Sequence, residues 1–190
     1  GRWLAGGGPV AGLLPVLSAQ LVGAARWLAR LLYRGLLLHC WLLLVLYLGF
    51  KFAERQYAIA VLPAQIETDG VVLISGESGL REGCGVAVLR MSANLRQRLT
   101  SHGLGALEQA RQARGHADEA YYSYAAWQPT PVLDSASEVS LGLGCADADE
   151  ALMLRINRAQ GSPGAFYSRK DEGLLLVIPA EGLIVLGYFG

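Results

Sequence analysis

A histidine lies within the most apolar part of the chain. His39 interrupts a long run of leucine, valine and aromatic residues. A histidine inside a membrane-spanning segment is costly unless it has a partner, and it can ligate a haem or a chlorophyll-type metal. The residues one helical turn further on are Leu42 and Leu43, which offer no second ligand. We interpret His39 as a hydrated or helix-contacting residue, with cofactor ligation as the alternative, and expect no cofactor.

A serine among glycines is the nearest approach to a catalytic nucleophile. Ser78 lies in the segment Gly76–Gly79, whose spacing differs from the G-x-S-x-G nucleophile elbow. Its base would have to be His102 or His116, and both lie in a polar region with helical periodicity. A serine in a turn is the simpler interpretation. We expect no enzymatic activity, and a periplasmic hydrolase is a minor hypothesis.

Five acidic residues lie close together near the third cysteine. They are Asp134, Glu138, Asp147, Asp149 and Glu150. Carboxylates at alternating positions can bind calcium, but the glycine and the distal glutamate of an EF-hand loop are missing. The sequence therefore predicts a solvated loop and no metal site.

The chain has three cysteines, and their surroundings differ. Cys40 lies in the apolar run, where it is expected to pack as a small residue. Cys84 and Cys145 each lie beside glycine in the downstream region. In an exported domain these two are expected to form a disulfide that closes a loop of about sixty residues. Two free thiols in a cytosolic domain are the alternative, and the lack of a C-x-x-C pair argues against zinc or thioredoxin-type chemistry.

Aromatic residues are concentrated in one short segment of the downstream region. They are Tyr121, Tyr122, Tyr124 and Trp127. Pro129 and Pro131 follow and favour extended backbone. Tyrosine and tryptophan provide contact area at low entropic cost, so the segment could be a protein-docking surface. It could equally belong to the core, and the sequence leaves both interpretations open.

The elements that position these residues begin with a membrane helix. The stretch Gly35–Phe50 carries no formal charge and is apolar on every helical face. With Leu31–Tyr33 and Phe52 it reaches the length of about twenty residues that a span requires. The sequence therefore predicts a transmembrane helix over 35–53.

The region 1–34 is predicted to lie in the membrane interface or to re-enter the membrane. Three arginines spaced by four residues would share one helical face, with an aromatic residue at the headgroup level. A first transmembrane helix over 3–25 is the alternative. A lysine can extend out of the far end of the span along its alkyl stem. The predicted anchoring residues are Arg26, Trp27, Arg30, Arg34 and Lys51.

Basic residues also predict the orientation of the span. The arginine group precedes it, whereas Glu54 separates the two basic residues that follow it. Basic residues favour the cytoplasmic side, so we expect a cytoplasmic N-terminus and an exported domain over 54–190. The segment Ala58–Ala60 has the small-x-small form of a signal-peptidase site, but it lies too far beyond the apolar run. We therefore expect a retained anchor.

The exported domain is predicted to be α+β, with a mainly antiparallel sheet and two helices between its early and late strands. Its strongly apolar late strands require cover on both faces. Ser92 has the position of a helix N-cap, and Gly103 lies just past the end of that helix. The second predicted helix is 104–114. The predicted strands are 57–62, a hairpin over 65–75 with its turn at Asp69-Gly70, 85–90, 152–157, 165–168, 174–178 and 183–188.

Taken together, these features predict a single-pass protein of a bacterial inner membrane with a periplasmic domain. Acidic and basic residues balance at 16 each, which gives no reason to expect nucleic acid as a partner. The expected partners are the lipid bilayer and other membrane or periplasmic subunits. The expected role is a non-catalytic scaffold or accessory subunit of an envelope assembly, such as a secretion, conjugation, pilus or membrane enzyme complex. The alternative is a subunit of an electron-transfer or pigment-binding complex with His39 as ligand.

Overall fold

A computed structural model describes residues 13–78, 83–133 and 137–190. The chain divides into two compact units, and the boundary lies between Lys51 and Phe52. The first unit is helical. The second, 52–190, is an α+β unit built on a six-stranded antiparallel sheet. The α+β class and the antiparallel sheet that the sequence predicts are therefore confirmed.

A single apolar helix occupies the N-terminal part of the described chain. Helix α1 runs from Leu13 to Val61 without a break at the predicted boundary between 34 and 35. Its 49 residues correspond to a length of about 74 Å. Within it, Gly23–Val61 is long and apolar enough to cross a membrane, and its most apolar window has no buried residue. Of the alternative span 3–25, residues 3–12 lie outside the described part of the chain.

The last turns of α1 belong to the globular unit. The sequence predicts a strand over 57–62, and this prediction is wrong because the helix continues to Val61. Ala58 and Val61 are three residues apart, so one helical face carries both into the core, where they are buried. Burial of this face outweighs the β propensity of the local sequence.

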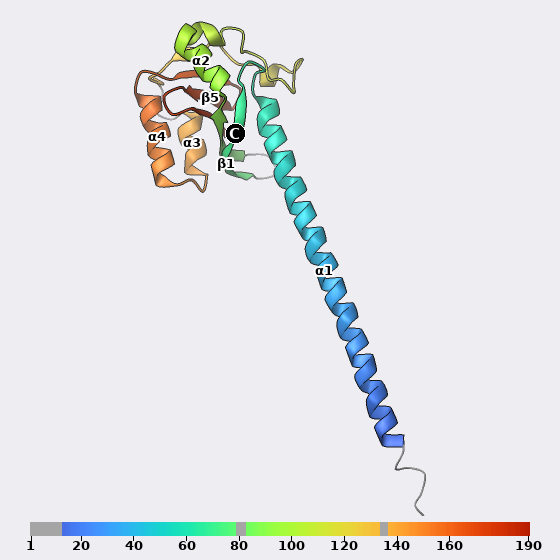
Figure 1. The fold of residues 1–190 in the computed structure, drawn as a ribbon. Coiled ribbons are helices and arrows are strands. Elements are labelled where there is room, and N and C mark those ends of the chain that lie inside the picture. The colour runs from blue at the N-terminus through green and yellow to red at the C-terminus, as the bar shows by residue number, and fades with distance from the viewer. Residues whose placement is uncertain (1–12, 79–82, 134–136) are drawn as a thin grey trace, which may run out of the picture. The chain divides into compact units, whose positions relative to one another are not determined.

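Six strands form the sheet, in the order β1-β2-β6-β5-β4-β3, with every neighbouring pair antiparallel (Figure 1). Their bounds are β1 Thr68–Ser78, β2 Gly83–Met91, β3 Gln128–Pro129, β4 Phe166–Lys170, β5 Gly173–Ile178 and β6 Leu183–Phe189. The predicted strands 85–90, 165–168, 174–178 and 183–188 are confirmed, with small differences at their ends.

Three α-helices follow β2 in the chain. They are α2 Ala93–His102, α3 Glu138–Gly144 and α4 Glu150–Gly161. The predicted N-cap of α2 is confirmed, because the Ser92 hydroxyl accepts a hydrogen bond from the Leu95 amide at 3.0 Å. Gly103 then takes a positive φ of 54°, which favours glycine and ends the helix. The sequence did not predict α3.

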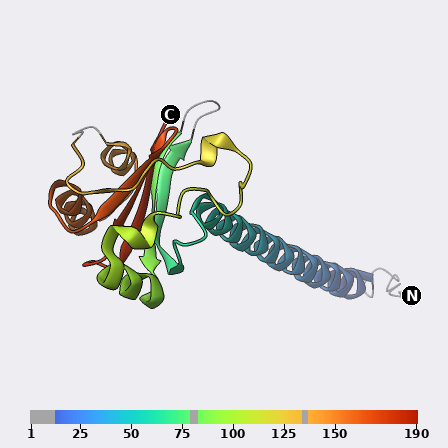
Figure 2. The ribbon, with the colours of Figure 1, turned by 90° about the horizontal axis from the view of Figure 1, so that it is seen from above.

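Both faces of the sheet are covered, as the apolar strands require (Figure 2). Strand β5 alternates between the faces, and all six of its residues are buried. Helices α3 and α4 cover one face. The end of α1, helix α2 and the irregular segment 103–127 cover the other.

Two other predicted elements are wrong. The segment 65–75 is no hairpin, because β1 continues past Gly70, where a register shift against β2 absorbs the extra residue. Strand β1 also includes Gly76 to Ser78, which were predicted as loop, and Gly79 lies outside the described residues. The segment 152–157 is part of α4. Leu152 and Ile156, four residues apart, are its buried face, and Asp149 caps its first turn.

The segment predicted as a second helix, 104–114, is helical only in its first turn. A 3₁₀ helix, η2, covers Gly103–Leu107. In the described residues that follow it there are isolated bridges at Gln112 and Ala113 and the short 3₁₀ helix η3, Ala120–Tyr122. The backbone beyond Leu107 bonds to other parts of the chain: the Arg114 amide donates to the Leu62 carbonyl at 2.9 Å. Contacts with the end of α1 therefore replace the predicted helix.

Arg114 also caps the turn that follows α1 with its side chain. Its guanidinium donates to the carbonyls of Leu62, Pro63 and Ile66 at 3.3, 2.8 and 2.6 Å. These residues come directly after the helix, which ends at Val61, and the charged donor satisfies their carbonyls. Partial burial lowers the pKa of Arg114 from its ordinary value.

Replacing Arg114 by methionine should lower the free energy of unfolding by about 2 kcal/mol, because three carbonyls lose a charged donor that is still partly exposed. Urea unfolding of the full chain in detergent, followed by near-ultraviolet circular dichroism, measures this. Arg90→Met, at an exposed strand position, is the control and should change stability little. Equal stability of the two variants would contradict the capping role.

Candidate functional site: a tyrosine-lined pocket

A pocket of about 250 Å³ lies between the end of α1 and the sheet. All its residues belong to the unit 52–190. We call its apolar lining residues the floor and its tyrosine and charged lining residues the rim. The floor residues are Ala58, Val61, Ile74, Ala87 and Leu186. The rim residues are Glu54, Tyr57, Tyr121, Tyr122, Lys170 and Tyr188.

Hydrogen bonds connect the tyrosines of the rim to one another and to an acidic residue. The hydroxyls of Tyr57 and Tyr122 lie 3.4 Å apart. Tyr121 donates to the Glu172 carboxylate at 2.9 Å, and its ring meets that of Tyr122 edge-on at 5.0 Å. Burial, followed by the bond to Glu172, raises the pKa of Tyr121 to about 12. The bond to Tyr57, followed by burial, raises the pKa of Tyr122 to about 12.

Glycines leave the space that Tyr188 occupies at one side of the pocket. Gly76 and Gly85 are paired across β1 and β2. A Cβ on Gly85 would lie 2.5 Å from the Tyr188 hydroxyl oxygen, and one on Gly76 would lie 2.8 Å from it. Burial and the nearby Glu54 carboxylate raise the pKa of Tyr188.

Lys170 is the basic side chain of the rim. Its ammonium lies 4.1 Å from the ring centroid of Tyr121 and 5.6 Å from that of Tyr122. It also donates to the Asp171 carbonyl at 2.6 Å. Burial lowers the pKa of Lys170, and the charges of Glu172 and Asp171 partly oppose this effect.

His116 closes the outer side of the aromatic group. Its ring stacks on Tyr122 at a centroid distance of 3.7 Å. Its Nδ1 lies 2.8 Å from a Glu119 carboxylate oxygen. His102 lies elsewhere, exposed at the end of α2. Ser78, interpreted from the sequence as a turn residue, is a strand residue paired with Gly83, and its side chain lies outside the described part of the structure.

The predicted docking segment divides into core and surface residues. Tyr124 and Trp127 are only 3% and 6% exposed. Tyr124 donates to the Val61 carbonyl at 2.9 Å, and Trp127 donates to the Ala110 carbonyl at 2.8 Å. These two side chains are core residues, so the docking interpretation does not apply to them. Tyr121 is 42% exposed and, with Tyr122, forms part of the pocket.

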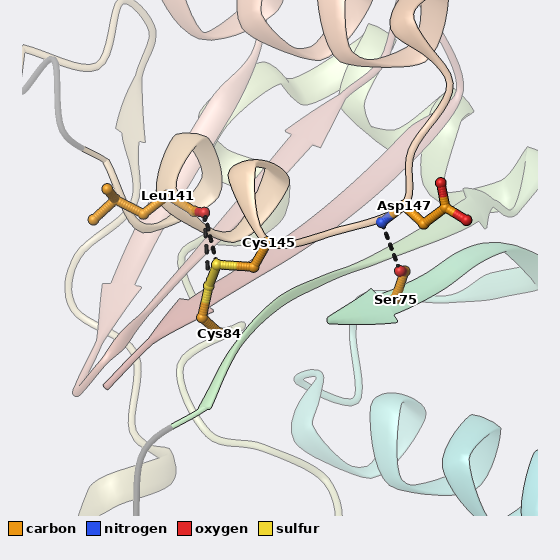
Figure 3. Close-up of a disulfide and its surroundings, with 5 residues drawn as sticks. All are labelled: Ser75, Cys84, Leu141, Cys145 and Asp147. Carbon is orange, nitrogen blue, oxygen red and sulfur yellow. Dashed lines mark hydrogen bonds between the residues drawn. A yellow bond between two sulfur atoms is a disulfide. The ribbon is translucent and has the colours of Figure 1, made fainter. Parts of the chain in front are cut away.

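The structure contains the predicted disulfide between Cys84 and Cys145 (Figure 3). The two Cα atoms lie 5.9 Å apart, and the residues are separated by 61 positions. The bond joins β2 to the end of α3, where both sulfur atoms lie near the Leu141 carbonyl. A Cβ on Gly187 of β6 would collide with the α3 backbone at Val139, so helix and sheet are in close backbone contact. Cys40, on α1, is free and exposed.

Asp149 and Glu138 make structural contacts with their carboxylates, and Asp147 makes one with its backbone amide. Asp149 accepts from the Ala151 and Leu152 amides at 3.0 and 3.3 Å. Glu138 pairs with Arg169 at 2.9 Å. The Asp147 amide donates to the Ser75 hydroxyl at 2.9 Å (Figure 3). Asp134 lies outside the described residues, and within the described residues no group of three or more potential ligands could hold a metal ion.

The predicted membrane-contacting residues all lie on α1. Trp27 is 63% exposed, and the neighbouring residues predicted to anchor the helix are exposed as well. They are Arg26, Arg30, Arg34 and Lys51. His39 is exposed on the same helix. None of these residues belongs to the pocket.

Compared with protein-family models, curated proteins and solved structures, the chain has no significant match. The pocket is therefore described by its own residues alone. Sequence reasoning missed Glu54, Tyr57, Lys170 and Tyr188. The available signal was the spacing of Glu54, Tyr57 and Val61, which are three and four residues apart and would share one helical face. The prediction of a strand over 57–62 excluded this interpretation.

Alkaline pH should destabilise the pocket. A tyrosine whose pKa is raised on folding contributes stability that is present below pH 10 and is lost as the pH rises through 12. The lowered pKa of Lys170 makes the stability rise with pH, but this rise ends near pH 10.5, the ordinary pKa of a lysine. The double variant Tyr121→Phe/Tyr122→Phe should therefore lose less stability over this range than the parent, measured by thermal unfolding. Tyr33→Phe, outside the pocket, is the control. A parental pH profile in the double variant would refute this account.

Replacing both cysteines of the disulfide by alanine should lower the free energy of unfolding by roughly 4 kcal/mol, the chain-entropy value for a loop of this length. Urea unfolding of the oxidised parent and the Cys84→Ala/Cys145→Ala variant measures this. In the oxidised parent, a maleimide should label Cys40 alone. Labelling of all three cysteines under denaturing, non-reducing conditions would contradict the bond, and Cys40→Ala serves as the matched control.

Proposed function

We propose that this protein is a non-catalytic, membrane-anchored subunit of a bacterial envelope assembly. Part of α1 crosses the inner membrane with its N-terminus in the cytoplasm, and the α+β unit lies in the periplasm. The observation that carries the proposal is the exposed apolar surface of α1, whose most apolar window has no buried residue in the described part of the structure. Such a surface requires lipid or protein cover.

Two features of the domain support export and a retained anchor. The Cys84–Cys145 disulfide is consistent with an oxidising compartment. The segment Ala58–Ala60 lies in the last turns of α1, and the Ala60 carbonyl accepts a bond from the Gly115 amide at 2.9 Å. Cleavage there would remove a buried part of the domain, so the helix is expected to stay attached.

The surface proposed for a partner subunit is the edge of β1. The C-terminal strands β4 to β6 have little free edge: β5 and β6 are internal, and the outer side of β4 contacts β3 and the Ala125 amide. Strand β1 is terminal in the sheet. The pairing of β1 with β2 shifts register at Val72. The side chains of Val71 and Val72 are both exposed, and Val72 is 43% exposed. An exposed sheet edge with apolar side chains suits strand addition by a partner.

A photoreactive amino acid at Val71 should crosslink to another envelope protein in native membranes. Adding Val72→Lys should reduce the yield severalfold, because a charged edge disfavours strand pairing. The matched control carries the probe at Leu141, an exposed apolar residue of α3, and should crosslink weakly.

Release of the chain by alkaline carbonate would refute the membrane anchor. Equal crosslinking from both positions, unaffected by Val72→Lys, would refute the β1 interface.

A further inference from the structure

The ammonium of Lys170 is partly buried without a direct counter-ion. Within the described residues, no carboxylate lies within the 4.0 Å that defines an ion pair with its Nζ. Its contacts are the ring faces of Tyr121 and Tyr122 and the Asp171 carbonyl. A half-buried cation beside an apolar floor favours a ligand that brings an anionic group, because a charge-assisted hydrogen bond would replace lost hydration.

The lining also contains groups of complementary character, Glu54 and the rings of Tyr57 and Tyr188. Carboxylates and aromatic faces both attract ammonium groups. The pocket therefore offers a cationic group, an anionic and aromatic group, and apolar lining residues. A zwitterion with an attached apolar part matches all three features.

The place of the pocket along α1 indicates where such a ligand would come from. The headgroup layer adds about 5–7 Å to each side of the hydrocarbon core. The helical wall of the pocket, Glu54 to Val61, covers about 12 Å beyond the end of the predicted span at residue 53. If α1 is anchored as proposed above, on which this inference rests, the wall begins in the headgroup layer.

We propose that the pocket binds the headgroup of a zwitterionic phospholipid from the adjoining leaflet. Lys170 contacts the phosphate, and the ammonium lies between Glu54 and the rings of Tyr57 and Tyr188. The glycerol end of the lipid rests on the apolar floor. The volume of about 250 Å³ is below that of sites for drug-sized ligands, so it holds the headgroup region and not a whole lipid.

Photoreactive lipids test this on the full chain in nanodiscs. The discs consist of phosphatidylglycerol with a minor fraction of phosphatidylethanolamine that carries a diazirine near the glycerol. After illumination, peptides containing Tyr57 or Tyr188 should carry label, as should peptides from 35–53. A photoreactive phosphatidylglycerol of equal chain length should label the pocket peptides about tenfold less.

Two variants and a control connect the label to the pocket. Lys170→Met should reduce labelling of the pocket peptides about tenfold, as expected for loss of one charge-assisted contact. Glu54→Gln should remove the preference for phosphatidylethanolamine. Arg158→Met, at an exposed position of α4, loses a positive charge outside the pocket and should label like the parent. Matching thermal unfolding midpoints of the variants establish that each is folded.

The outcomes separate this inference from the proposed function. Label on 35–53 without label on the pocket peptides would overturn lipid binding in the pocket while leaving the anchor in place. Absence of label from both regions would overturn the anchor as well. Equal pocket labelling by the two lipids, or labelling unaffected by Lys170→Met, would also overturn the inference. If a crosslinked protein partner prevents lipid labelling of the pocket peptides, the pocket is assigned to protein binding instead.

Discussion

The carbonyl groups at the end of α1 are the constraint on which the rest of the domain depends. A helix leaves its last four carbonyls without internal donors. Here two of the donors come from a segment some fifty to sixty residues further along the chain: the Gly115 amide bonds the Ala60 carbonyl, and the Tyr124 hydroxyl bonds the Val61 carbonyl. This requirement holds the segment 107–127 in an irregular path against the helix. The same path places Tyr121 and Tyr122 opposite Tyr57, so the capping of α1 also builds the pocket.

Burial on both faces of the sheet is the second constraint. Strand β5 has no polar face, so the sheet is stable only as the middle of three layers. One outer layer, α3 with α4, approaches closely because glycine occupies position 187, and the disulfide holds the end of α3 to β2. The other layer includes the last turns of α1. The helix that contains the candidate membrane span therefore also supplies residues 52–61 to the domain.

Electrostatic groups at the pocket are arranged by packing and not by sequence proximity. Glu54, Tyr121, Lys170 and Tyr188 come from four separate parts of the chain. Lys170 and Glu172, two residues apart, both meet Tyr121: one lies over its ring and the other accepts from its hydroxyl. Burial lowers the pKa of the Lys170 amine and raises that of the Tyr121 phenol, whereas the bond to Tyr57, followed by burial, raises the pKa of Tyr122.

Local signals in the sequence determined several features without tertiary information. The uncharged apolar run, the Ser92 cap, the two apolar strands that end the chain and the pairing of Cys84 with Cys145 each follow from composition, capping chemistry or the number of cysteines. Only the tertiary structure decided that α1 continues to Val61 and that 152–157 is helical. Their apolar residues fit either period, and contacts with distant strands selected the helix. The pocket was beyond local prediction for the same reason, because its residues meet only when the sheet and the end of α1 pack together.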